Sequence, residues 1–311
     1  MHATRTHRRI VYFFGSAILI LLALFFLAVL GIGVFSLYSS PAEAPVETFT
    51  VKILRAPATP FLEEKEAVVV EPTTKEGNPT VMPVEKVLFE YVEVKDGCGV
   101  HFEGACLNVR AGPGTEYPVV AQLRNNMVLK IGGAVERDGQ TWYKIVFDET
   151  LRYPERVASD WYVAAEYVNI LLDEGDRTVW DHGSATNTKR IVVDRSEQKL
   201  YAYDGDVLFM EMAISTGLEL TPTPRGTFTI FKKTPSRYMQ GPLPGIADQY
   251  YDLPGVPWNL YFTKQGAVIH GAYWHNSFGS AYSHGCVNLP PNKARELYNW
   301  AELGTTVIVR D

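Results

Sequence analysis

The sequence predicts a mostly β protein with few helices, carried behind a single transmembrane helix. Three observations lead to this class. Residues 10–38 contain neither a charge nor a proline, residues 39–91 are rich in proline, and from residue 92 onward short alternating runs are separated by turn signals. With 46% apolar and 21% charged residues, the chain has the composition of a protein with a sizeable core.

The apolar stretch of residues 10–38 follows three arginines in residues 1–9. About 20 apolar residues cross a bilayer, and basic flanks stay in the cytoplasm. We therefore expect a cytoplasmic tail at 1–9, a single-pass helix in the cytoplasmic membrane and an extracytoplasmic remainder. The alternative is a cleaved signal peptide, because residues 42–44 read Ala-Glu-Ala. The apolar stretch exceeds the usual ~7–15 residues, however, and Pro45 would follow the cut.

Residues 39–91 are predicted to be an extracytoplasmic linker. Recurrent prolines and charges without a helical period give a semi-extended spacer that cannot bury a core. The whole chain has 35 acidic and 29 basic residues. Because a negative surface repels polyanions, we expect no nucleic-acid partner.

Residues 92–170 show the spacing of a small all-β barrel, with turn signals at residues 112–114 and 138–139. The segments LNVRAGPGTEYPVVAQL, WYKI and DWYVAAEYV resemble the bacterial Src-homology-3-like module, with an insertion at residues 148–159. The resemblance implies either contact with cell-wall glycan or peptide, or a spacer that binds nothing.

Residues 171–189 are predicted to connect this module to a β-rich domain at 190–311. Strands are predicted at residues 190–194, 198–216, 226–233, 266–273 and 305–310. Asp204-Gly205 is a hairpin signal within the second run. One helix is predicted from the helical spacing of Ala294, Leu297, Tyr298 and Ala301. The Pro-, Gly- and aromatic-rich residues 236–262 are expected to form a lid or a surface excursion.

The chain contains three cysteines. Cys98 and Cys106 are eight residues apart and could close a short loop as a disulfide, which would leave Cys286 as a free thiol. The alternative is that all three are small buried side chains.

A nucleophilic thiol needs a base, and three histidines lie close to Cys286 in the sequence. His270 ends a predicted strand and is favoured as the base over His284, which is two residues before the cysteine. His275 and His182 are expected in loops.

The residues beside the cysteine also have candidate roles. Gly285 permits a tight turn that could direct backbone N–H groups to an oxyanion. Ser283 and Asn288 could orient His284 or the substrate, or could satisfy backbone groups of the loop.

The segments IHG at residues 269–271 and SHGCVNL at 283–289 are similar to the signature of L,D-transpeptidases. VDRSEQKLYAY (193–203) and STGLELTPTPRGTFTIFKK (215–233) also resemble that family. The resemblance implies that Cys286 attacks a tetrapeptide stem of bacterial peptidoglycan, releases D-alanine and passes the acyl group to the amine of a second stem. Donor and acceptor stem peptides are thus the expected partners.

In terms of that family, His270 is the base and the Gly271 carbonyl orients its imidazole. His284, Gly285 and Cys286 shape the donor pocket and the oxyanion site, and neither a metal nor an organic cofactor is implied. Many members have an arginine where this chain has Asn288. Arg225 or Arg237 is therefore considered for a substrate carboxylate.

Several alternatives remain at this point. His270, His284 and Cys286 could bind zinc, although the sequence lacks an H-E-x-x-H or Cys-x-x-Cys spacing. Water could replace the acceptor amine, which would give an L,D-carboxypeptidase. Other wall cysteine hydrolases usually place the cysteine before the histidine. A non-catalytic wall-binding envelope protein is the alternative of another class.

Overall fold

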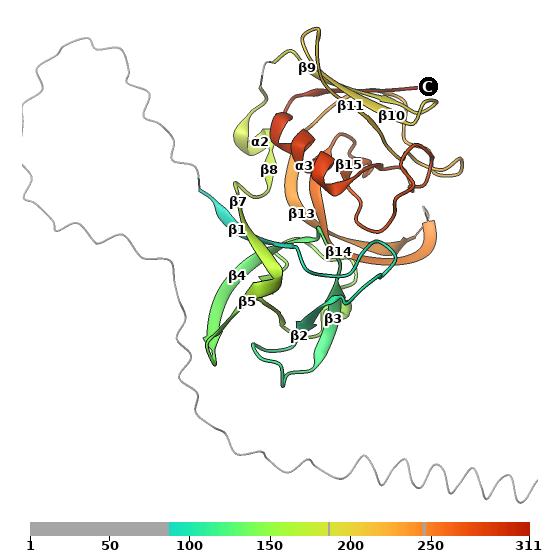
Figure 1. Ribbon diagram of the computed structural model, residues 1–311. Coiled ribbons are helices and arrows are strands. Elements are labelled where there is room, and N and C mark those ends of the chain that lie inside the picture. Colours follow the sequence, from blue (N-terminus) through green and yellow to red (C-terminus); the bar gives the residue numbers. More distant parts are fainter. Residues whose placement is uncertain (1–86, 186, 245–246) are drawn as a thin grey trace, which may run out of the picture. The chain divides into compact units, whose positions relative to one another are not determined.

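The computed structural model describes residues 87–185, 187–244 and 247–311 (Figure 1). All of them belong to one compact unit. The predicted helix at 10–38 and most of the predicted linker at 39–91 lie outside the described residues. In the described ranges, no helix has the length and apolar character needed to cross a membrane.

The described chain is mostly β with few helices, as predicted. The strands are β1 (Phe89–Val94), β2 (Leu107–Arg110), β3 (Val119–Leu123), β4 (Val128–Arg137), β5 (Gln140–Val146), β6 (Trp161–Ala164), β7 (Val168–Asp173), β8 (Arg177–Thr178), β9 (Lys189–Asp194), β10 (Lys199–Asp204), β11 (Val207–Ala213), β12 (Gly226–Thr229), β13 (Lys232–Leu243), β14 (Ala247–Tyr261), β15 (Val268–Gly271), β16 (Val287–Leu289) and β17 (Thr306–Arg310). The helices are α2 (Val179–His182), α3 (Pro291–Trp300) and the 3₁₀ turns η1 (Pro154–Arg156) and η2 (Ala165–Tyr167).

Strands β1–β7 form one antiparallel sheet in the order β3-β2-β6-β5-β4-β1-β7, called here the amino-terminal sheet. The predicted turn between β4 and β5 is present: Asp138 and Gly139 both have positive φ, of 51° and 76°. Two such residues are what a tight two-residue hairpin loop requires. Cys98 and Cys106 are joined by a disulfide before β2.

The remaining strands form two five-stranded sheets, ordered β11-β10-β9-β17-β12 and β16-β15-β14-β13-β8. Most pairs are antiparallel, but β17 lies parallel to β9 and β16 lies parallel to β15. Buried apolar side chains from both sheets and from α3 form one cluster. The predicted helix is confirmed: α3 starts at Pro291 and buries Ala294, Leu297 and Tyr298.

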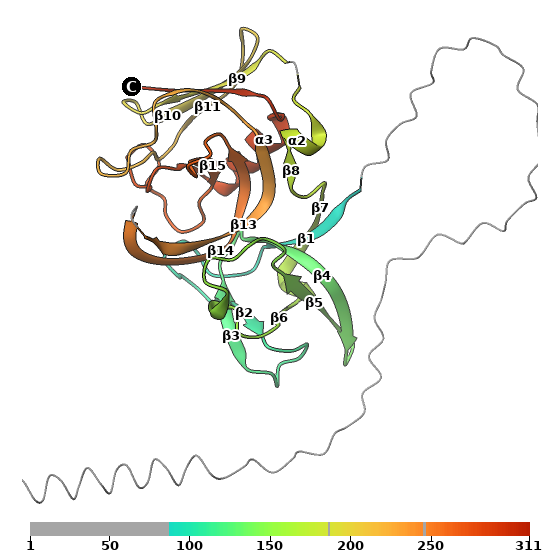
Figure 2. The same cartoon turned by 180° about the vertical axis from the view of Figure 1, so that it is seen from behind.

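The segment at residues 236–262 was expected to be a lid or a surface excursion, and that expectation is wrong. It belongs to a long antiparallel hairpin of β13 and β14, which lies against β4 (Figures 1 and 2). The pairing shifts register twice, once between Gly241 and Leu243 around Pro242. Proline is tolerated in a strand where the ladder is interrupted, so the proline content did not preclude a sheet.

The predicted insertion at residues 148–159 packs on this hairpin. The backbone N–H of Tyr153 donates to Gln240 Oε1 at 2.9 Å, and Gln240 Nε2 donates back to the Tyr153 carbonyl at 3.1 Å. Arg156 donates to the Gly241 carbonyl at 2.8 Å. The amino-terminal sheet therefore supports the hairpin through specific polar contacts.

Candidate active site

Cys286 lies directly before β16 and is a half-buried free thiol. Its Sγ is 3.8 Å from the Gly266 carbonyl oxygen, which precedes β15. The carbonyl of Cys286 accepts hydrogen bonds from Ser283 Oγ at 2.5 Å and from Thr223 Oγ1 at 3.5 Å. The backbone of the cysteine is thus held by two hydroxyl groups.

The side chain of Ser283 closes the turn at residues 283–286. The N–H of Gly285 donates to Ser283 Oγ at 3.1 Å, and Gly285 has a φ of 114°. Residues other than glycine rarely adopt this backbone conformation. Ser283 is buried and His284 is exposed.

A second segment, residues 215–223, packs along this turn. The N–H of Ser283 donates to the Thr216 carbonyl at 3.0 Å, and the N–H of Leu218 donates to the Ser283 carbonyl at 2.9 Å. A Cβ on Gly217 would lie 2.2 Å from the Thr221 carbonyl oxygen, so this close approach requires glycine.

Gln198 holds Thr216 in place from the strand β10 side. Its Oε1 accepts from the Thr216 N–H at 2.9 Å, and its Nε2 donates to Thr216 Oγ1 at 2.7 Å. Gln198 was not predicted to have a role in the site, because nothing in its spacing connects it to the cysteine. It lies within the VDRSEQKLYAY segment, and that was the available signal.

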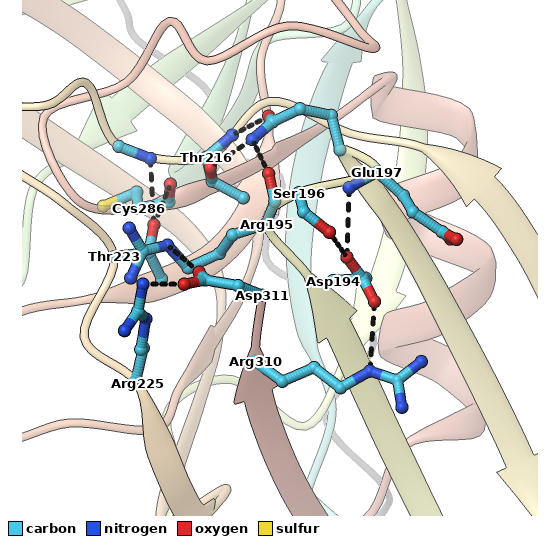
Figure 3. A network of polar contacts seen from close by, with 12 residues as sticks. Asp194, Arg195, Ser196, Glu197, Thr216, Thr223, Arg225, Cys286, Arg310 and Asp311 are labelled. Atoms are coloured by element: carbon cyan, nitrogen blue, oxygen red, sulfur yellow. Dashed lines mark hydrogen bonds and ion pairs between the residues drawn. The ribbon is translucent and has the colours of Figure 1, made fainter.

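Arg310 and Asp311, at the carboxy-terminal end of the chain, form ion pairs close to the segment that contains Gln198 (Figure 3). Arg310 Nε donates to Asp194 Oδ2 at 3.0 Å, while Asp194 Oδ1 accepts from the Glu197 N–H at 3.0 Å. Asp311 forms ion pairs with Arg195 and with the exposed Arg225. Arg225, one of two candidates for binding a substrate carboxylate, is therefore already paired.

His270 lies on β15 and is 1% exposed. Its Nδ1 is 3.1 Å from the Gly271 carbonyl oxygen, which can only accept, so Nδ1 carries the proton. Nε2 is then an acceptor, and it is buried without a hydrogen-bond partner. A Cβ on Gly271 would lie 2.9 Å from Pro257 Cγ, so glycine is required there.

Strand register places His270 on β15 and Cys286 directly before the neighbouring strand β16. In the parallel pair of β15 and β16, Ile269 is opposite Val287 and His270 is opposite Asn288. Cys286 therefore falls level with Val268, two residues before His270. Residues two apart on a strand share a face, so the imidazole projects on the side of the sheet where Val268 meets the cysteine.

Both titrating groups are neutral at neutral pH. Burial lowers the pKa of His270 to about 4, with the hydrogen bond to Gly271 opposing the shift and the charge of Arg237 adding to it. Burial raises the pKa of the Cys286 thiol, which Arg237 and the N–H of Val268 partly oppose. In the resting structure the thiol and the imidazole are thus both uncharged.

Arg237 is the nearby cation and is the second candidate for binding a substrate carboxylate. It lies on β13, with its guanidinium carbon 5.4 Å from the centre of the Tyr261 ring. Tyr261 pairs with Val268 on the neighbouring strand β15. Val268 is the residue that lies level with Cys286. In the part of the chain that the structure describes, Arg237 forms no hydrogen bond or ion pair with a carboxylate.

His275 lies in the loop between β15 and β16, as expected, but its side chain is buried, with 1% exposed. Its Nδ1 accepts the N–H of Ser277 at 3.1 Å, and its Nε2 is 2.9 Å from the amide of Asn288. His182, at the end of α2, is exposed. The clustering of His270, His275 and His284 in the sequence was the signal for a role of His275.

The residues proposed for zinc are not grouped as a metal site. Within residues 87–311, apart from the three positions left undescribed, no three His, Cys, Asp or Glu side chains are placed to hold a metal ion. The disulfide of Cys98 and Cys106 belongs to the amino-terminal region and is not part of the site.

Residues 188–309 match the family model of the L,D-transpeptidase catalytic domain, and residues 105–169 match that of the bacterial SH3 domain. Along the chain, the match to the bacterial SH3 domain thus precedes the match to the L,D-transpeptidase catalytic domain. The matched catalytic region contains both His270 and Cys286, together with the segments that brace them.

Three L,D-transpeptidases illustrate the similarity. YkuD of Bacillus licheniformis is 31% identical over 123 residues, which cover 39% of this chain and 64% of that protein. L,D-transpeptidase 3 of Mycobacterium tuberculosis is 32% identical over 105 residues, covering 32% and 38%. This chain therefore spans less than two thirds of the length of either relative.

Among solved structures, the catalytic domain of the Enterococcus faecium L,D-transpeptidase acylated by ertapenem is 29% identical. The alignment covers 41% of this chain and all of that domain, with a TM-score of 0.36.

Proposed function

We propose that this protein is a membrane-anchored L,D-transpeptidase that forms peptidoglycan cross-links through a thioester on Cys286, with His270 as base and acid. The observation that carries the proposal is the placement of a free thiol directly before β16 and, on the neighbouring strand β15, of a buried imidazole whose unprotonated Nε2 has no partner. Both residues lie inside the segment that matches the family.

The reaction proceeds in two half-reactions. His270 Nε2 takes the proton of Cys286, and the thiolate attacks the carbonyl between the third residue of the donor stem and its terminal D-alanine. The carbon–nitrogen bond breaks, and His270 returns the proton to the departing amine. An amine of an acceptor stem then attacks the thioester, loses its proton to His270 and displaces the thiolate of Cys286, to which His270 passes the proton.

The turn at residues 283–286 supplies the oxyanion donors in this scheme. The N–H of Gly285 is bound to Ser283 Oγ, so Gly285 acts by shaping the turn. The N–H groups of His284 and Cys286 are the donors that we assign to the developing oxyanion. Arg237, a cation without a carboxylate partner in the described part of the chain, is assigned to a carboxylate of the stem.

The decisive experiment incubates the full-length protein with a disaccharide-tetrapeptide and identifies the products by mass spectrometry. We expect a dimer lacking one D-alanine, and no product with Cys286→Ser or His270→Ala. A disaccharide-tripeptide alone would instead indicate an L,D-carboxypeptidase. An absence of product together with no adduct on Cys286 after ertapenem treatment would contradict an enzymatic role and favour a non-catalytic envelope protein.

The membrane anchor is part of the proposal and is supported by the uncharged stretch at residues 10–38. The chain would then be a single-pass protein with its amino terminus in the cytoplasm and residues 87–311 in the wall space. We expect it to stay in the pellet after alkaline carbonate extraction of membranes. Recovery in the soluble fraction would favour a cleaved signal peptide. A wall-binding role of residues 92–170 stays a prediction.

A further inference from the structure

Four buried or half-buried groups beside Cys286 form a closed circuit of hydrogen bonds. Asn288 exchanges both backbone bonds with Ser215, at 2.8 and 3.0 Å. Ser215 Oγ donates to the Ser277 carbonyl at 2.5 Å, and the Ser277 N–H donates to His275 Nδ1 at 3.1 Å. His275 Nε2 lies 2.9 Å from the side-chain amide of Asn288, which closes the circuit.

The circuit determines which nitrogen of His275 carries the proton. A backbone N–H can only donate, so Nδ1 of His275 must be unprotonated to accept from Ser277. Burial lowers the pKa of His275 to about 4, so the ring is neutral at neutral pH. A neutral imidazole with an unprotonated Nδ1 has its proton on Nε2, which therefore donates toward Asn288.

This tautomer also determines how the Asn288 amide is oriented. The amide nitrogen Nδ2 lies 2.9 Å from His275 Nε2, and the amide oxygen Oδ1 is buried without a partner. Two donors cannot bond to each other, and the nitrogen and oxygen of an amide are assigned from their partners. Turning the amide by half a rotation gives Nε2–H an acceptor and places the amide nitrogen, instead of the oxygen, at the position without a partner.

We propose that His275 is a positioning residue for Cys286, which it holds through the Nε2–H bond to Asn288 Oδ1. The proposal rests on the proposed function, because it names a further residue on which acyl transfer depends. His275 does not touch the reacting atoms. It acts through β16, whose first residue directly follows the cysteine.

Strand β16 needs such support because it has three residues and a single neighbour, β15. Its middle residue is Asn288, which is 2% exposed. The circuit binds that residue from the side opposite β15, through Ser215 and His275. The rings of Tyr282 and Phe278 pack at 4.4 and 5.0 Å from the His275 ring centre and fix its orientation.

The test compares variants of the full-length protein in their acylation by ertapenem. His275→Phe keeps a flat ring and loses both hydrogen bonds. We expect the acylation rate constant at saturating ertapenem to fall by about 100-fold, since small misplacements of a reacting group cost that much. The half-saturating concentration should not change, because His275 does not contact the ligand. The matched control is His182→Phe, the same change at an exposed site.

Two conservative variants separate positioning from general packing. The amide of a glutamine reaches the position of Nε2 and can donate to Asn288, whereas the amide of an asparagine reaches only the position of Nδ1. We expect His275→Gln to recover more of the rate constant than His275→Asn. Equal rate constants for His275→Phe and the wild type, or full recovery with His275→Asn, would overturn the proposal.

A second measurement does not depend on acyl transfer or on the folding of a variant. Long-range ¹H–¹⁵N correlation spectra of the wild-type protein report which nitrogen of each histidine is protonated. We expect protonated Nε2 and unprotonated Nδ1 at His275, and a protonated Nδ1 would overturn the proposal. A wild-type protein that ertapenem does not acylate, yet that shows this tautomer, would contradict the proposed function and leave the circuit supported.

Discussion

At the scale of single residues, the surroundings of Cys286 and His270 keep both side chains uncharged. Burial raises the pKa of Cys286 and lowers that of His270 to about 4, so a thiolate–imidazolium pair is disfavoured in this structure. In the proposed mechanism, the proton therefore moves only once a substrate is bound. A thiol kept protonated is also a poor target for oxidants and metals.

The charge of Arg237 affects the pKa of both Cys286 and His270, and replacing Arg237 gives a prediction. Its positive charge lowers the pKa of the thiol and that of the imidazole. In Arg237→Met both pKa values should rise, so alkylation of Cys286 by iodoacetamide should shift to higher pH and be slower at pH 7. Cys98 and Cys106 are paired, so only one thiol reacts. Arg225→Met, at the arginine bound to Asp311, is the control, and equal profiles for both variants would contradict this role.

The candidate pair was suggested by the sequence, whereas the residues that contact its segments were not. His270 and Cys286 were chosen from their resemblance to the family signature, which their sixteen-residue interval fits. Gln198 and His275 act through contacts that only the folded chain creates, across pairs such as Ser215 and Asn288. Burial of a histidine depends on the packing of distant segments, which local spacing does not contain.

At the scale of elements, helix α3 is attached to the hairpin by a buried lysine. Lys233 of β13 donates through Nζ to the carbonyls of Tyr298 and Ala301, at 2.7 and 2.6 Å. These carbonyls lie at the end of the helix, where backbone acceptors lack partners within the helix and a cation is favourable. Burial nevertheless lowers the pKa of Lys233 to about 7.

This shift gives a prediction for stability against pH. Unfolded lysine keeps its proton to about pH 10.5, whereas Lys233 in the folded state loses it near 7. Between these values the unfolded state binds more protons, so this group makes the free energy of unfolding rise with pH. Lys233→Met should remove that rise, on the order of a few kcal/mol. The free energy of unfolding in urea, measured at pH 6, 8 and 10, tests this expectation. An equal dependence on pH in the variant and the wild type would contradict the assignment.

The hairpin shows where prediction of elements from the sequence failed. Residues 236–262 carry several prolines and glycines, which favour loops in isolation. Long-range pairing with β8 and β15, together with the insertion at 148–159, outweighs this local preference. Helix α3 was predictable because its spacing and its proline at the start are local features.

At the scale of the whole described molecule, the amino-terminal sheet and the catalytic region share a polar contact around Glu149. Its Oε1 accepts the N–H of Tyr238 at 2.6 Å, and Ser236 Oγ donates to the Val128 carbonyl at 2.6 Å. A small cavity of about 30 Å³ lies beside these groups. Burial raises the pKa of Glu149 to about 7.

Glu149 therefore makes this contact weaker in alkaline solution. The folded state keeps the Glu149 proton to about pH 7, and the unfolded state loses it near 4.5. The folded state binds more protons in that window, so the free energy of unfolding falls as pH rises through it. Glu149→Gln keeps the acceptor for Tyr238 and should raise the free energy of unfolding at pH 8 by on the order of 1–3 kcal/mol. At pH 4 both proteins should unfold alike, and a less stable variant at pH 8 would refute this account.

The order of regions along the chain was predictable, but the contact between them was not. Turn signals such as Asp138-Gly139 and alternating runs are local, and they identified most strands. The contact uses scattered polar residues such as Glu149 and Gln240, which have no common spacing. Such complementarity exists only between two folded surfaces.

Strand β17 fixes the order in which the catalytic region can be completed. Thr306 pairs with Arg190 in a parallel ladder, and β17 separates β9 from β12 in the middle of their sheet. Before residues 306–310 are synthesised, β9 and β12 lack the strand that lies between them, and Asp194 lacks its hydrogen bond from Arg310. Contacts this distant in sequence form late. We therefore expect the segments that hold Cys286 to gain their full set of contacts only after this last strand has been added.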